Sequence, residues 1–271
     1  MKAIRIADAG DPRLAAYAGL RDPALRRAGL FVAEGRLVVE RLLAAGRHRV
    51  RSVLVTDPMM PALEAVLGHV DPPPSVYVAT AAILRQVAGY DFHRGCLALA
   101  ERGEPPALPA LLDAVGAGKA TLLVLDEVSN PDNVGGLFRS GAALGAAGVL
   151  LSPGSGDPLY RKTVRVSMGA SAALPWARAR DWPHDLDDLA GAGFGMVALT
   201  PGGDDLDAGA AAGLPERLAL VVGAEATGIS PGTRARAART LGIPMVPGVD
   251  SLNVVAAAAI ALHRLRRRPP H

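Results

Sequence analysis

The run from Leu122 to Leu125 is apolar at every position and ends at Asp126, which narrows the choice of folds sharply. An alternating pattern would leave one face of a strand to water, whereas a continuous apolar run is typical of a strand buried on both faces. Similar short runs follow, separated by stretches with helical spacing. Strands are expected at 121–126, 148–151, 176–178, 196–199, 218–222 and 243–246, and helices at 134–144, 160–167, 186–192, 233–240 and 252–267. This order predicts an α/β fold with a parallel sheet.

The front of the chain repeats the alternation on a smaller scale. Strands are expected at 29–33, 52–56, 76–79 and 96–100, with helices at 37–46, 59–67 and 81–87 between them. We therefore predict a small α/β/α domain over 1–103 with a largely parallel sheet. Prolines at 105, 106 and 109 and glycines at 116 and 118 mark 104–119 as a linker, so 120–271 forms a second domain.

Composition excludes several classes of protein. Cys96 is the single cysteine, so we expect neither a disulfide framework nor a cysteine-built metal site, and no cofactor metal is predicted. No apolar run approaches the roughly 20 residues of a membrane span, and a signal-peptide pattern is absent, so a cytoplasmic protein is expected. Basic residues outnumber acidic ones in 1–51 and gather again after Arg264. Such ends favour an anionic partner, although solvation and helix-dipole effects explain them equally well.

Three polar clusters follow expected strands, at the edge where parallel sheets bind ligands. They centre on Asn133 with Arg139, on Glu225, and on Ser251 with Asn253. Each also has a purely structural explanation, because asparagine and serine before a helix are common caps. The adjacent glycines at 135 and 136 each weaken a helix by about 1 kcal/mol, which argues for close approach by a ligand or another segment. Neither phosphate-loop pattern, G-x-G-x-x-G or G-x-x-x-x-G-K-[ST], is present.

Together the clusters resemble the three motifs of the SpoU (TrmH) branch of the SPOUT RNA methyltransferases. The matching stretches are Asn133-Val134-Gly135-Gly136-Leu137-Phe138-Arg139, Gly223-Ala224-Glu225-Ala226-Thr227-Gly228, and Ile243-Pro244-Met245 through Ser251-Leu252-Asn253-Val254. Residues 31–35 and 90–95 are similar to the substrate-binding domain that ribosomal-RNA members carry in front. Two positions depart from the pattern: Val255 stands where the family often has a second serine, and Ala226-Thr227 where a glycine is frequent.

The resemblance implies methyl transfer from S-adenosylmethionine to the 2'-hydroxyl of a ribose in structured RNA, with ribosomal RNA expected first. It also implies a C-terminal SPOUT domain with a deep trefoil knot, and a homodimer. Alternatives are a transfer-RNA 2'-O-methyltransferase and a non-catalytic ribosome-associated RNA-binding module of the same fold. A nucleotide-dependent enzyme of the ordinary doubly wound type is disfavoured because the phosphate-loop patterns are missing.

Residue roles follow from the same resemblance. Catalytic residues are expected to be Arg139, Asn133, Glu225, Ser251 and Asn253, and cofactor contacts Thr200, Gly202, Gly223, Glu225, Ile243, Met245 and Leu252. Arg139 is either the base for the ribose hydroxyl or a phosphate dock, and docking is physically easier because a guanidinium keeps its proton and is a poor base. Arginines expected to bind RNA are Arg21, Arg26, Arg27, Arg36 and Arg94, each of which also fits a solvated surface.

Overall fold

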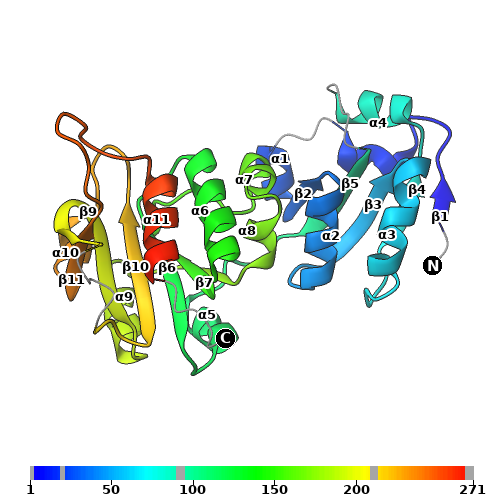
Figure 1. Ribbon diagram of the computed structural model, residues 1–271. Coiled ribbons are helices and arrows are strands. Elements are labelled where there is room, and N and C mark those ends of the chain that lie inside the picture. The colour runs from blue at the N-terminus through cyan, green and yellow to red at the C-terminus, as the bar shows by residue number, and fades with distance from the viewer. Residues whose placement is uncertain (1–2, 19–21, 90–94, 208–212, 266–271) are drawn as a thin grey trace, which may run out of the picture. The chain divides into compact units, whose positions relative to one another are not determined.

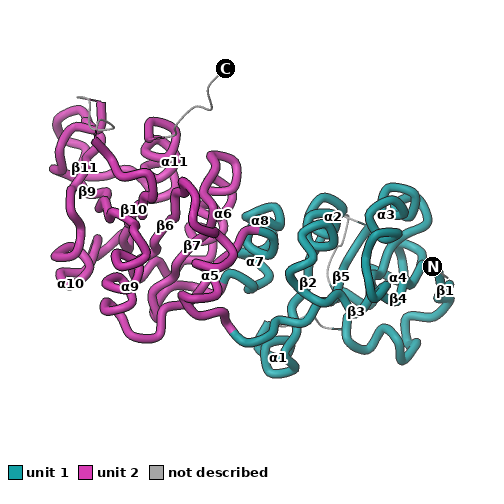
Figure 2. The backbone as a smooth tube through the Cα atoms, turned by 90° about the horizontal axis from the view of Figure 1, so that it is seen from below, with its two compact units in different colours: residues 1–104, 158–173 teal, residues 105–157, 174–271 magenta. Residues whose placement is uncertain are grey.

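The computed structural model describes residues 3–18, 22–89, 95–207 and 213–265 of the chain. It divides into two compact units, one of residues 1–104 and 158–173 and the other of residues 105–157 and 174–271 (Figures 1 and 2). Within the described residues, no helix has both the length and the apolar character needed to cross a membrane.

The first unit is built on a five-stranded sheet in the order β1-β4-β3-β5-β2. Its strands are β1 (Ala3–Arg5), β2 (Leu30–Glu34), β3 (Val50–Val55), β4 (Ser75–Val78) and β5 (Cys96–Glu101). Its helices include α1 (Asp22–Arg27), α2 (Arg36–Ala45), α3 (Met60–Leu67) and α4 (Ala81–Ala88), with short 3-10 helices at Pro12–Tyr17 and Asp57–Met59. The expectation of a largely parallel sheet is wrong here, because β5 runs antiparallel to both of its neighbours, β2 and β3. The sheet is therefore mixed.

A segment from the middle of the chain completes this unit. Residues 158–173 form α7 (Arg161–Val166) and α8 (Ala170–Ala173), which pack on β2 and α2. Nη2 of Arg161 pairs with Oε2 of Glu34 at 3.0 Å, with the Glu34 side chain almost fully buried. The backbone N–H of Arg161 also donates to Oδ1 of Asp22 at 2.8 Å. The ion pair with Glu34 thus holds residues 158–173 against the rest of the first unit.

The second unit contains a six-stranded sheet in the order β11-β9-β10-β6-β7-β8. Its strands are β6 (Ala120–Asp126), β7 (Gly148–Leu151), β8 (Trp176–Arg178), β9 (Gly195–Asp205), β10 (Arg217–Gly223) and β11 (Arg239–Gly242). Every pairing is parallel, which confirms the predicted parallel sheet. The trefoil knot remains a prediction.

Helices cover both faces of this sheet, as the apolar run in β6 requires. Leu122 and Val124 of β6 join a core with α5 (Leu108–Val115) and α9 (Asp185–Gly191). Leu123, between them in the strand, points to the opposite face, where it lies against Gly141 of α6 (Pro131–Leu144). Helix α11 (Val254–Leu265) packs beside α6 and over β9 and β10 (Figure 1). Helix α5 falls within the stretch 104–119 and packs on β7 and β8.

The sequence pattern was misleading between 233 and 246. The helix expected at 233–240 is limited to α10 (Pro231–Arg234), and the strand expected at 243–246 lies earlier, at β11. Strand β11 pairs first with Val197 and Ala198 of β9 and then, after a shift in register, with Asp204 and Asp205. At the second of these places the backbones of Gly203 and Gly242 come very close. A Cβ on Gly242 would lie 2.8 Å from the carbonyl oxygen of Gly203. Two glycines permit this approach, whereas Pro244 lacks the N–H that a strand at 243–246 would use.

Candidate active site

The first motif lies in the opening turns of α6, and its cap is not the residue that the sequence indicated. Asn130 caps the helix, since its Oδ1 accepts the N–H of Asp132 at 2.9 Å, and Pro131 occupies the first helical position. Asn133 therefore keeps its side chain for other contacts, and the residue is only 6% exposed.

Asn253 joins the three motifs at one point. Its Nδ2 donates to Oδ1 of Asn133 at 3.1 Å and to Oε1 of Glu225 at 2.9 Å. Its Oδ1 accepts the N–H of Val255 at 2.9 Å, and its carbonyl accepts the N–H of Ala257. Asn253 is therefore the cap of α11 and also the residue that links α6 to the loop after β10. The capping and site explanations hold together.

A tight turn after β10 presents Glu225. The N–H of Gly228 donates to the carbonyl of Ala224 at 2.8 Å, and Gly228 has a φ of +68°. A Cβ on Gly223 would collide with the backbone of Gly228, so glycine is required at the start of the turn. After the turn, the N–H of Ser230 donates to Oδ2 of Asp126, a fully buried carboxylate at the end of β6.

The glycine pair in α6 lets a second helix approach closely. A Cβ added to Gly136 would lie 2.7 Å from Cγ2 and 2.9 Å from Cγ1 of Val255 in α11. The predicted close approach is thus by another segment of the chain, at least at Gly136. Asn133, Gly136 and Arg139 are each three residues apart, so they occupy neighbouring positions along α6.

A cavity of about 660 Å³ opens between the middle of β9, the end of β10 and residues 243–254. It is lined by Leu199, Thr200, Pro201, Val222, Gly223, Ala224, Glu225, Ala226, Thr227, Gly228, Ile229, Arg234, Ile243, Met245, Ser251, Leu252, Asn253, Val254 and Ala257. Six of the seven expected cofactor contacts are in this lining, and Gly202 is not. Among the expected catalytic residues, Glu225, Ser251 and Asn253 line the cavity, and Asn133 adjoins it through Asn253. Arg139 does not line it.

Arg139 is exposed on α6 and makes no hydrogen bond or ion pair with any residue that the structure describes. Such a side chain is available to a partner outside the chain. Of the arginines expected to bind RNA, Arg21 and Arg94 lie outside the described residues. Arg26 and Arg27 are exposed at the end of α1, and Arg36 pairs with Glu40 at 2.8 Å.

Sequence reasoning missed two groups of residues. Arg234 lines the cavity, and its Nη2 donates to Oγ1 of Thr200 at 2.7 Å. Arg234 lies shortly after the second motif, and that position could have indicated a residue of the site. The sequence pattern instead placed it inside a helix expected at 233–240. In the first unit, Arg49 and Arg51 border a hollow of about 370 Å³, and both pair with Glu101. Among the described residues, no cluster of three metal-ligating side chains occurs.

Comparison with known proteins adds independent evidence. The model of the SpoU rRNA methylase family matches residues 120–263. An uncharacterized tRNA/rRNA methyltransferase of Mycobacterium bovis is 38% identical over 98% of this chain and 92% of its own length. An AdoMet-bound rRNA methyltransferase from Sinorhizobium meliloti has a similar fold, with a TM-score of 0.80, 24% identity and 97% of each chain covered. A structure described as an RNA 2'-O ribose methyltransferase has a TM-score of 0.74 and 26% identity, covering 97% of this chain and 98% of that one.

Proposed function

This chain belongs to the SpoU rRNA methylase family, and we propose that it transfers a methyl group from S-adenosylmethionine to a ribose 2'-hydroxyl of ribosomal RNA. The observation that carries the proposal is the hydrogen-bonded group of Asn133, Glu225 and Asn253 on the wall of the cavity. Residues from three distant parts of the sequence meet there, and a site of that kind is where a ligand and a reacting group can be held together.

The cavity suits S-adenosylmethionine in size and in chemistry. Its volume is within the range of about 300–1,000 Å³ that is usual for small-molecule sites. Ile243, Met245 and Leu252 supply an apolar wall that would pack against the flat adenine. Glu225 supplies a carboxylate on the wall, which suits a ligand that carries positive charge. When bound, the cofactor supplies an electrophilic methyl group on a sulfonium.

The protein's own contribution is mainly positioning. Holding a ribose hydroxyl in line with the methyl group can lower a barrier by up to about 7–11 kcal/mol in favourable cases. Asn253 fixes Glu225 and Asn133 at the cavity, and the turn at 223–228 gives the wall its shape. Arg139, exposed and without a described partner, docks a phosphate of the RNA and brings the ribose to the site. This role also agrees with the permanent charge of a guanidinium, which makes it a good phosphate ligand and a poor base.

A homodimer is part of the proposal. Apolar side chains are exposed on α11 and on the loop before it, at Ile260, Val246, Val249 and Leu252. A second copy of the chain covering this surface would remove them from water, and it would contribute to the RNA site. Sedimentation equilibrium at working concentration should give twice the mass of one chain, and a stable monomer would contradict the dimer.

Arg139 offers the sharpest test of the reaction. Turnover and RNA affinity should be measured separately for Arg139→Ala, Arg139→Lys and, as a control, Arg180→Ala, an exposed arginine outside the cavity lining. We expect Arg139→Ala to lose RNA affinity and about 10-fold or more in turnover, because it removes one or two charge-assisted hydrogen bonds of about 1.5–3 kcal/mol each. Arg139→Lys should keep part of the affinity while turnover falls. Near-normal turnover in Arg139→Ala would contradict both proposed roles of this residue.

The substrate can be identified by mapping 2'-O-methylated riboses in total RNA with and without the protein. We expect a protein-dependent site in ribosomal RNA. A site confined to transfer RNA would overturn the ribosomal assignment but keep the reaction. Calorimetry with S-adenosylmethionine addresses the non-catalytic module, because a chain of that kind has no need to bind the cofactor.

A further inference from the structure

The cavity wall has a simple charge distribution. Among the described residues that line it, Glu225 and Arg234 are the ionisable side chains. They belong to different parts of the wall: Glu225 is hydrogen-bonded to Asn253 at the start of α11, and Arg234 to Thr200 in β9. The wall therefore offers one fixed negative group and one fixed positive group, at places supported by separate elements.

Arg234 has hydrogen-bonding capacity left for a ligand. A guanidinium carries five N–H donors in a rigid fork, and the bond to Oγ1 of Thr200 uses one of them. Thr200 in turn donates to the carbonyl of Pro201 at 2.9 Å, which fixes the orientation of its hydroxyl as an acceptor for Arg234. The Arg234 side chain is exposed at the cavity, where its remaining donors are accessible.

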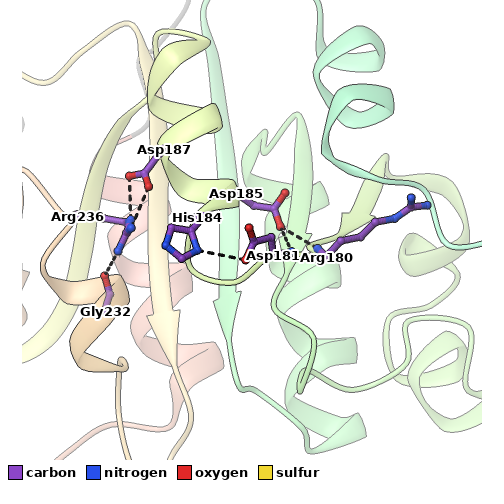
Figure 3. Close-up of polar contacts among 7 residues, drawn as sticks. All are labelled: Arg180, Asp181, His184, Asp185, Asp187, Gly232 and Arg236. Atoms are coloured by element: carbon purple, nitrogen blue, oxygen red, sulfur yellow. Dashed lines mark hydrogen bonds and ion pairs between the residues drawn. The ribbon is translucent and has the colours of Figure 1, made fainter.

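The short helix α10, which carries Arg234, is held in place by contacts with neighbouring elements. Arg236, two residues on, pairs with Asp187 of α9 through Nε at 2.8 Å and Nη2 at 2.9 Å, and its Nη1 donates to the carbonyl of Gly232 (Figure 3). Gly232 also lies close to Pro183, since a Cβ there would be 3.0 Å from Cγ of that proline. With Ser230 bonded to Asp126, α10 is held at its start and at its end. Arg234 thus projects from a helix whose two ends are both held by hydrogen bonds.

We propose that Arg234 binds the carboxylate of S-adenosylmethionine. This inference rests on the proposed function. The cofactor has one anionic group, its carboxylate, and two cationic centres, the ammonium and the sulfonium. The positive group of the wall matches the anionic group of the ligand, and Glu225 matches the cationic centres. A guanidinium that is already oriented by Thr200 can offer two parallel N–H donors to a carboxylate.

A matched pair of ligands isolates this contact. S-adenosylmethionine and its decarboxylated form differ in the carboxylate and keep the adenosine, the sulfonium and the ammonium in common. Their affinities should be measured by calorimetry for the wild-type chain, Arg234→Ala, Arg234→Lys and the control Arg180→Ala. Arg180 is also exposed, and its side chain points away from the neighbouring aspartates (Figure 3).

The expected result is a selective loss. Arg234→Ala should weaken S-adenosylmethionine binding roughly 10- to 100-fold, from the loss of a charge-assisted contact, and should leave the decarboxylated ligand unchanged. Arg234→Lys should recover part of the loss, and Arg180→Ala should match the wild type. Unchanged binding of the decarboxylated ligand in Arg234→Ala also shows that the cavity is folded.

Three outcomes would overturn the inference and leave the proposed function standing. They are equal weakening of both ligands, no change for either ligand, and a loss of RNA affinity alone, which would make Arg234 an RNA contact. A wild-type chain that binds neither ligand would instead remove the proposed function and this inference with it.

Discussion

Gly136→Ala tests how α6 and α11 are packed at the site. The new Cβ would lie 2.7 and 2.9 Å from the two γ carbons of Val255, well inside the separation of about 3.5–4.0 Å at which carbon atoms attract. Valine cannot easily turn away, because a β-branched side chain in a helix has one strongly preferred rotamer. Either α11 moves or Val255 leaves that rotamer.

The two opposing contributions can be compared. Replacing a helical glycine with alanine stabilises a helix by about 1 kcal/mol, whereas overpacking of a close contact costs about 1–3 kcal/mol. We expect Gly136→Ala to be destabilising by up to about 2 kcal/mol. The sharper quantity is its coupling to Val255→Ala, which removes both clashing methyl groups. The double variant should be more stable than the sum of the single variants by about 1–3 kcal/mol.

The assay uses the two tryptophans of the chain, Trp176 and Trp182, which both lie in the second unit. Their fluorescence in urea titrations follows the unfolding of that unit. Gly191→Ala is the matched control, because Gly191 ends α9 with open space around its missing Cβ, so this change should be neutral or stabilising. If Gly136→Ala behaves like Gly191→Ala, with a coupling to Val255 below about 0.5 kcal/mol, the packing argument is wrong.

Two further predictions concern Asn253 and His48. Asn253→Asp keeps an acceptor for the N–H of Val255 but places a carboxylate against Glu225 and Asn133. This variant should lose about 1–3 kcal/mol of stability, measured by urea titration, and most of its cofactor affinity, measured by calorimetry. Asn253→Ser, which lacks the new charge, should be milder, and equal effects would exclude repulsion. Burial holds the pKa of His48 below its ordinary 6.5, despite the nearby Glu101 carbonyl. The free energy of unfolding of the first unit should therefore carry no penalty from His48 above about pH 6.5. It should fall as the pH drops below that value, because the unfolded chain then binds the proton more readily than the folded one. The urea concentration at which the buried Cys96 thiol becomes half labelled should show this fall with pH. His48→Gln should make the fall smaller. An identical dependence of the midpoint on pH in both proteins would contradict the assignment.

The parallel sheet of the second unit was predictable from the sequence, whereas the mixed sheet of the first was not. Apolar runs such as Leu122 to Leu125 report burial on both faces, and burial on both faces is common to all the strands of a covered parallel sheet. Strand β5 is just as buried, but its direction depends on how the connection from α4 returns, which no local pattern encodes. The error at 233–246 has another cause. The strand there pairs with β9, and its last residues depend on Gly203 and Gly242, which allow the two backbones to approach closely. These contacts join residues that are distant in the sequence.

The candidate site was predictable where a motif carries its own backbone requirement. Gly223, Glu225 and Asn253 fall on the cavity because the tight turn at 223–228 and the cap of α11 are local structures. Arg234 was missed because its importance depends on Thr200, more than thirty residues away in the sequence, and on the support that Asp187 gives to α10 through Arg236. Contacts of this kind become visible only when the sheet has brought β9, α9 and α10 together.

The departure at Val255 is compatible with an intact site because Asn253 uses the backbone of that residue. The bond from the N–H of Val255 to Oδ1 of Asn253 is available to any residue except proline, so exchanging a serine side chain for valine leaves the cap of α11 in place. The valine methyl groups instead fill the space above Gly136, where a serine would offer less apolar contact. In this chain, packing between Val255 and Gly136 holds α11 against α6. The distance between Asn253 and Asn133 therefore depends on that packing, and for this reason Gly136→Ala should also weaken cofactor binding even though Gly136 does not line the cavity.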